Sequence, residues 1–214
     1  MNARAIQFEK NCNVLKKYIP EPVVETMAMW IVDYDFKLKI KKERSTKLGD
    51  YSSPQGGMNH VITINHNLNR YSFLITLIHE VAHLTTFNKF KNSVMPHGQE
   101  WKNEFRTLMQ PFLVTEVFPV DVLYAIRQYI QNPAASSCSD TRLLRTLKLY
   151  DEDNGQIFLE HLPFKSVFLY NDKVFQKGER IRKRFRCTEI SKGTVYLFNP
   201  LTEVELFEEL ADNK

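Results

Sequence analysis

Hydrophobic residues in the first 130 positions recur mainly at helical spacing. This periodicity covers residues 4–18 and 23–32, which the tripeptide PEP separates, and it returns over residues 98–109 and 120–130. Between these segments, FKLKIKKE and HVITINH alternate as β-strands do, and KLGDYSSPQGG is typical of a short strand ending in a Pro/Gly turn. The pattern therefore predicts an α+β fold for this part of the chain.

Helical periodicity fades after the segment QNPAASSCSD, residues 131–140. Short alternating segments follow, and the tripeptides YND and SKG between them are typical of hairpin turns. We therefore expect two domains: an α+β domain over residues 1–132 and a small antiparallel β domain over residues 133–214.

One further helix carries the candidate chemistry, in the segment LITLIHEVAHLTTF. Asn67 and Asn69 are plausible N-caps for it. Its apolar residues follow i, i+3, i+4, i+7 spacing and form one stripe: Leu74, Leu77, Ile78, Val81 and Leu84. At about 100° per residue, His79 and His83 fall on the opposite side of the helix, within about 40° of each other. The stripe therefore predicts that the two histidines face a cleft; the alternative is a buried helix with an accidental HExxH string.

Two histidines one helical turn apart can both offer a neutral imidazole nitrogen to a zinc ion. A catalytic zinc site has three protein ligands and keeps one position for water. In HEVAH, Glu80 lies beside the first histidine, where it can act as general base on the zinc-activated water. The motif thus predicts hydrolysis, with His79 and His83 as ligands of one Zn²⁺ ion.

The third ligand is expected to be His97, which follows a loop and opens the next helix in HGQEW. Glu100 and Glu104 are rivals, because glutamate is the third ligand in other zinc hydrolases. The extended pattern HExxHxxGxxH is excluded, since Thr86 and Lys89 stand where it needs glycine and histidine.

Charge adds a second candidate site. The formal net charge is only +4, but basic residues gather in residues 37–47 and 177–186. Such runs bind nucleic acid or an acidic partner, or they are the solvated face of an edge strand. The nucleic-acid candidates of the second run are Lys177, Arg180, Arg182, Lys183, Arg184 and Arg186.

Several classes of protein are disfavoured. No apolar run approaches the roughly 18–20 residues of a membrane helix, so no membrane partner is expected. The charged N-terminus does not resemble a secretory signal, which predicts a cytoplasmic location. Cys12, Cys138 and Cys187 lie far apart, which disfavours both a disulfide framework and a cysteine metal site.

Four segments in order, LGDYSSP, HVITINHNLNR, LITLIHEVAHLTTF and HGQEWKNEF, resemble the SprT-like family, which includes the Spartan proteases. The resemblance covers about residues 38–109. It implies a zincin-type metalloprotease core with His79, His83 and His97 as zinc ligands and Glu80 as the catalytic residue. Substrates of Spartan-type relatives are proteins crosslinked to DNA, so a protein substrate associated with DNA is the implied partner.

The C-terminal part is similar to the region that follows the protease core in many members, which often carries a four-cysteine zinc ribbon. The outline RFRC…GTVYLFNP is present, but only Cys187 remains of the cysteines. We therefore expect a degenerate ribbon without a structural zinc, held together by apolar packing.

Two other functions stay open at this stage. One is a nucleic-acid-binding or transcription-associated module whose zinc is structural, which the basic runs favour. The other is a regulatory protease specific for one repressor. The group that stabilises the transition state also stays open, with Tyr51 among the tyrosines that precede the motif helix.

Overall fold

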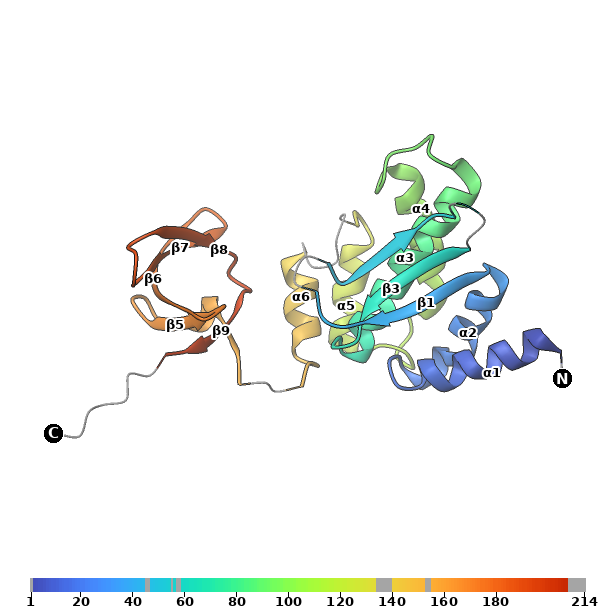
Figure 1. Cartoon of the computed structure of the whole chain (residues 1–214), viewed down its shortest axis with the longest axis horizontal. Helices are drawn as coiled ribbons and strands as arrows, with labels where there is room; N and C mark the ends of the chain where they lie inside the picture. Colours follow the sequence, from blue (N-terminus) through green and yellow to red (C-terminus); the bar gives the residue numbers. More distant parts are fainter. Residues whose placement is uncertain are drawn as a thin grey trace. The chain divides into compact units, whose positions relative to one another are not determined.

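The computed structural model describes residues 2–44, 47–54, 56, 59–133, 140–152 and 155–207. The chain divides into two units, Met1–Asp151 and Glu152–Lys214 (Figure 1). The first unit mixes helices with a small sheet, and the second contains an antiparallel sheet, so the predicted α+β class is confirmed. Within the described residues, no helix is both long and apolar enough to cross a membrane.

The helices of the first unit are α1 (Ala3–Leu15), α2 (Val24–Asp33), α3 (Arg70–Phe90), α4 (Gln99–Met109), α5 (Val120–Tyr129) and α6 (Thr141–Lys148), with short 3-10 turns η1 (Glu21–Val23) and η2 (Gln110–Phe112). The first five agree with the predicted helices. Asn69 caps α3, because its side-chain oxygen accepts hydrogen bonds from the backbone N–H groups of Tyr71 and Ser72. The motif helix is therefore fixed at its start by one of the two expected asparagines.

The sheet of the first unit has the strand order β1 (Phe36–Lys41), β3 (His60–Asn65), β2 (Gly49–Ser52). β1 runs parallel to β3, and β2 runs antiparallel to it. In the described sheet β2 is therefore an edge strand with β3 as its one strand neighbour. It also contacts α3.

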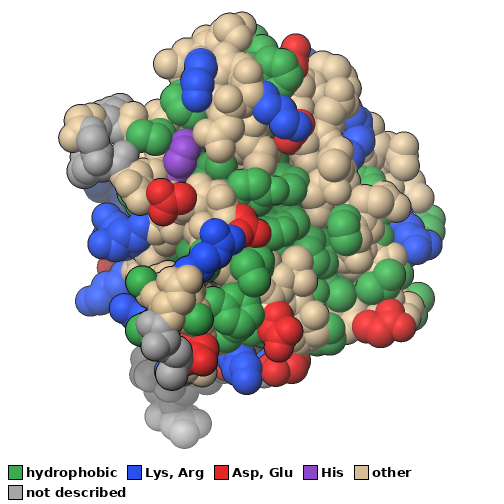
Figure 2. All heavy atoms as spheres, turned by 90° about the vertical axis from the view of Figure 1, so that its right-hand side faces the viewer, with side chains coloured by type: hydrophobic (Ala, Val, Ile, Leu, Met, Phe, Trp, Pro, Cys, Tyr) green, Lys and Arg blue, Asp and Glu red, His purple; other side chains and the backbone are tan. Residues whose placement is uncertain are grey.

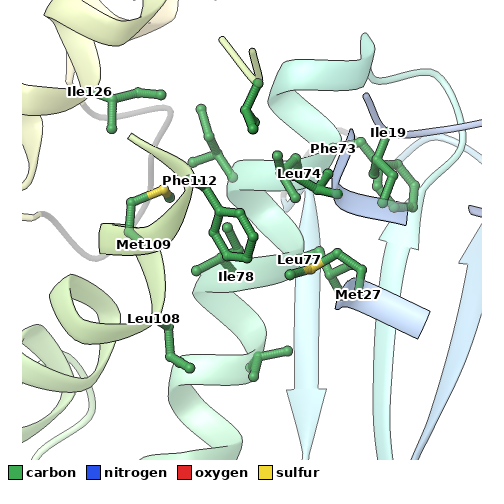
Figure 3. Packing of buried hydrophobic residues seen from close by; sticks show 14 of the residues in the cluster. Ile19, Met27, Phe73, Leu74, Leu77, Ile78, Leu108, Met109, Phe112 and Ile126 are labelled. Atoms are coloured by element: carbon green, nitrogen blue, oxygen red, sulfur yellow. The ribbon is translucent and has the colours of Figure 1, made fainter. Parts of the chain in front are cut away.

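Helix α3 lies at the centre of the first unit, with residues 73–82 buried without interruption. Figure 3 shows Leu74 and Leu77 directed toward Ile19 and Met27, while Ile78 faces Met109 and Phe112 on the other side. The predicted stripe is buried, and burial also extends to the opposite side of the helix, where the histidines face a cleft as predicted. His79 and Glu80 are 7% and 6% exposed, because Trp101 of α4 covers the histidine and β2 lies against the glutamate.

Helix α6 was not predicted. Its Leu143 and Leu147 are buried in the core of the first unit, and the Asn69 side chain donates a hydrogen bond to the Leu147 carbonyl at 2.9 Å. These contacts place α6 in the first unit, so the structural division falls after Asp151, whereas the sequence boundary was placed at 132/133.

The second unit contains β4 (Ile157–Phe158), β5 (Val167–Tyr170), β6 (Lys173–Ile181), β7 (Arg184–Glu189), β8 (Val195–Phe198), β9 (Glu203–Leu206) and the 3-10 turn η4 (Leu159–His161). Its strand order is β4-β9-β5-β6-β7-β8, with antiparallel pairs throughout the described sheet. Phe168, Phe175 and Phe198 form its core with Cys187. Cys12 and Cys187 are free thiols, and Cys138 lies outside the described residues.

Candidate metal centre

Two elements bring the candidate ligands together. Helix α3 presents His79 and His83 one turn apart, and the loop before α4 supplies His97. The backbone of His97 has φ 60°, in the left-handed region that non-glycine residues rarely adopt. Such a conformation costs about 1–3 kcal/mol and is typical of functional sites, where surrounding contacts hold it.

The three imidazoles converge on one point through the same ring atom. The Nε2 atom of His97 lies 2.9 Å from Nε2 of His83 and 3.3 Å from Nε2 of His79. Nitrogen atoms bound to one tetrahedral zinc at 2.0–2.1 Å lie about 3.3 Å apart, so these distances fit a shared metal ion. Neither Glu100 nor Glu104 belongs to the metal-binding group found among the described residues, and Glu104 instead pairs with Lys89 at 2.6 Å.

A fully buried tryptophan packs against all three imidazoles. The Trp101 ring centroid lies 4.6 Å from that of His79, 5.3 Å from that of His83 and 4.7 Å from that of His97. Trp101 in turn stacks on Phe105 at 5.4 Å. The helix α4 therefore supplies an aromatic wall that limits how far the imidazoles can rotate.

Burial sets the protonation of the histidines. It lowers the pKa of His79 to about 2 and that of His83 to about 3, with the neighbouring imidazoles adding to the effect. Burial also lowers the pKa of His97. All three rings are therefore neutral near pH 7, which is the form that binds a metal ion.

The pKa of Glu80 shifts in the opposite direction, upward. Burial, followed by the nearby Asp50 carboxylate, raises the pKa of Glu80 to about 8, although Lys47, Arg44 and a hydrogen bond from the Tyr51 backbone act against this rise. A carboxyl group that titrates near neutral pH can both take up and release a proton, and a bound cation beside it would lower its pKa.

These groups line one cleft of about 660 Å³. One wall is β2, with Gly49, Asp50 and Tyr51, and another is the segment from Lys91 to His97. Gly49 and Asp50 both belong to the LGDY segment, but no pattern in the sequence marks them as site residues. His79, Glu80 and His83 therefore lie together on the lining of this cleft.

Tyr51 lies in this cleft, as one of the open candidates for a transition-state donor. Its hydroxyl is hydrogen-bonded to Nδ1 of His60 at 2.8 Å, and its ring is parallel to that of His83 at a centroid distance of 6.4 Å. The structure therefore joins Tyr51 to His60.

The basic candidates of the second unit divide into two groups. Arg180, Arg182, Lys183, Arg184 and Arg186 are exposed on the β6–β7 hairpin. Lys177 is only 4% exposed, and its ammonium group donates hydrogen bonds to the backbone carbonyls of Glu160 and Leu162. Lys177 is therefore removed from the nucleic-acid candidates, because its side chain points into the β unit.

Residues 26–122 match the family model described as the SprT-like family. This segment, which contains the three-histidine cluster, is therefore similar to the SprT-like family. Searches of curated proteins and of solved structures found no match. At family level the match supports a zincin-type, zinc-dependent metalloprotease, and the histidine cluster provides a donor set in which zinc fits.

Proposed function

We propose that this protein is a zinc-dependent endopeptidase of the SprT-like type. The observation that carries the proposal is the convergence of three neutral imidazole nitrogens beside a buried glutamate in an open cleft. His79, His83 and His97 would hold one zinc ion. The match of residues 26–122 to the SprT-like family model supports peptide-bond hydrolysis as the reaction.

When bound, zinc supplies a Lewis acid that polarises the scissile carbonyl and makes water more acidic. The Glu80 carboxylate then takes the proton of the attacking water and passes it to the leaving amine nitrogen. General acid–base catalysis of this kind contributes about 10²–10⁴-fold. Trp101 holds the imidazoles from behind, and the cleft walls orient the polypeptide.

We further propose that the substrates are proteins bound or crosslinked to DNA. The supporting observation is the exposed basic hairpin of the second unit, with Arg180, Arg182, Lys183, Arg184 and Arg186. Basic side chains gathered on one hairpin match the phosphate backbone in charge. On the face of the molecule that Figure 2 shows, basic, acidic and apolar side chains are instead spread among one another.

The test of the enzymatic proposal is the Glu80→Gln variant. It should retain wild-type zinc content and lose cleavage of a DNA-bound protein, measured with and without single-stranded DNA. Glu104→Gln is the matched control, because Glu104 pairs with Lys89 outside the histidine cluster. If wild type and Glu80→Gln behave alike in every cleavage assay while both hold zinc, the zinc is structural and the enzymatic proposal is wrong.

The test of the DNA proposal is charge reversal of Arg182, Lys183 and Arg184. Wild-type affinity for DNA should fall steeply with salt, with a slope in log–log form of about −0.7 for each phosphate contacted on a single strand. The reversed variant should lose most of this affinity. Reversal of Lys37, Lys39 and Lys41, which are exposed on the edge strand β1, is the control of equal charge. Cleavage of one narrow substrate without DNA stimulation would instead favour a regulatory protease.

A further inference from the structure

The strand β2 approaches the catalytic glutamate so closely that position 49 has no room for a side chain. A Cβ atom built on Gly49 would lie 2.7 Å from Oε1 and 3.0 Å from Cγ of Glu80. It would also lie 2.7 Å from Cγ2 of Thr76, which is one helical turn before Glu80 on α3. Contacts of this length are not found around real Cβ atoms, so a side chain at position 49 must displace its neighbours.

Backbone conformation does not explain this glycine. Gly49 is not among the residues with positive φ, and it lies within a regular strand paired with Ile64 of β3. An alanine would fit the backbone there without strain. The requirement for glycine at this position is therefore one of space next to Glu80.

The same strand also holds the carboxylate. The backbone amide of Tyr51, two residues after Gly49, favours the ionised Glu80 carboxylate and so opposes the rise of its pKa. Asp50, between them, lines the cleft and forms a 2.8 Å ion pair with Lys47. Along β2, Gly49 thus leaves space for the glutamate, Asp50 places a negative charge near it, and Tyr51 presents a backbone amide to it.

We propose that β2 positions the general base, because Gly49 leaves the space that the Glu80 side chain occupies. Gly49 is a positioning residue, since it acts on the reaction only through Glu80. The inference rests on the proposed function for its catalytic meaning, but the packing that it describes can be tested without any cleavage assay.

The kinetic test is Gly49→Ala, with Ser52→Ala on the same strand as control because Ser52 is exposed. A displacement of about 1 Å at a catalytic group can cost about 100-fold in rate. Gly49→Ala should therefore lower kcat about 100-fold while KM stays within about twofold and zinc content stays at the wild-type value. Ser52→Ala should match wild type in all three. A Gly49→Ala protein with wild-type kcat would overturn the proposal.

The second test uses the Tm of the zinc-free protein to measure how tightly Gly49 packs against Glu80 and Thr76. Gly49→Ala should lower Tm by several degrees in the wild-type background, because the new methyl group is overpacked. In a Thr76→Ser/Glu80→Ala background the three short contacts are gone, and the same substitution should leave Tm nearly unchanged. Equal Tm losses in both backgrounds would show that Gly49 does not make room for Glu80.

The two tests separate the failure of this inference from the failure of the proposed function. If wild type cleaves no protein substrate, the endopeptidase proposal fails, yet the background dependence of Tm still decides whether β2 and Glu80 are packed as described. If wild type is active and the Tm losses are equal in both backgrounds, only the positioning role is wrong.

Discussion

The two units both bury ionisable side chains, but they satisfy them in different ways. In the second unit, Lys177 donates to two backbone carbonyls, and the buried Glu189 accepts from the hydroxyls of Ser191 and Tyr196. In the first unit, His79, His83 and His97 turn the same ring nitrogen toward one another. Buried polar groups that are satisfied internally have a structural role, whereas like groups that converge on one point indicate a ligand.

Hydrogen bonding alone cannot satisfy the three imidazoles. A hydrogen bond between two neutral imidazoles needs one nitrogen as donor and the other as acceptor. Three Nε2 atoms at one point cannot all be paired in this way, whereas each can donate its lone pair to a shared cation. The contrast with Lys177 and Glu189 is therefore the structural argument for a metal in the first unit.

The largest expected effect comes from removing one buried aromatic ring in each unit. Trp101→Ala should cost about 3–5 kcal/mol of stability, and Phe168→Ala a similar amount in the second unit, because both rings are fully buried. Denaturant unfolding measures this loss. The zinc content separates the two variants: it should fall in Trp101→Ala, where the imidazoles lose their wall, and stay at the wild-type value in Phe168→Ala. Equal zinc loss in both would contradict the assignment of the metal to the first unit.

Removal of zinc by a chelator should destabilise the first unit alone. A ligand present at 100 times its Kd stabilises the folded state by about 2.7 kcal/mol. The metal-binding group found among the described residues is His79, His83 and His97, and the second unit contributes nothing to it. Hydrogen exchange of backbone amides should therefore speed up in α3 and α4 and remain unchanged in β6 and β7. Faster exchange in both units would argue against a metal site confined to the first.

A smaller effect is expected at the buried lysine. Lys177→Met keeps the length of the side chain but leaves the carbonyls of Glu160 and Leu162 without their donor, at a cost of about 1–3 kcal/mol. Affinity for DNA, measured by fluorescence anisotropy, should not change, unlike that of the Arg182/Lys183/Arg184 reversal. A loss of DNA affinity in a folded Lys177→Met protein would return this residue to the binding surface.

Acid should also destabilise the zinc-free protein. Because burial lowers the pKa of His79, the unfolded chain takes up a proton below about pH 6.5 while the folded protein does not. The contribution of neutral His79 to the free energy of unfolding is therefore complete above about pH 6.5. It falls by about 1.4 kcal/mol for each pH unit below that value. The raised pKa of Glu80 acts in the opposite direction, since the folded state binds its proton more tightly. Denaturant titrations should therefore use Glu80→Gln, and equal stability at pH 7 and pH 5 would contradict burial of neutral histidines.

Sequence patterns predicted local structure well in both units. Helical spacing gave α1 to α5 within a few residues, and alternation gave the main strands, because each pattern reflects which face of an element is buried. For α6, which was not predicted, the signals in the sequence are Asp140 as N-cap and the spacing of Leu143 and Leu147. The gathering of His79, His83 and His97 follows from the motif and the short loop after it.

Properties that depend on contacts between distant elements could not be predicted. The burial of α3 on its histidine side arises from α4, so the stripe alone could not show it. The inward direction of Lys177 depends on its strand register, opposite Cys187 of β7. The space at Gly49 exists only because β2 and α3 meet. Each of these requires knowledge of which elements pack together.

The most direct test of the central claim is the zinc content of purified protein after dialysis against metal-free buffer, compared with its His97→Ala and His60→Ala variants. One zinc ion per chain is expected in wild type and in His60→Ala, since His60 bonds Tyr51 and is not one of the converging imidazoles. His97→Ala should hold much less. A wild-type protein without zinc after reconstitution, or a His97→Ala protein with a full ion per chain, would contradict the three-histidine site.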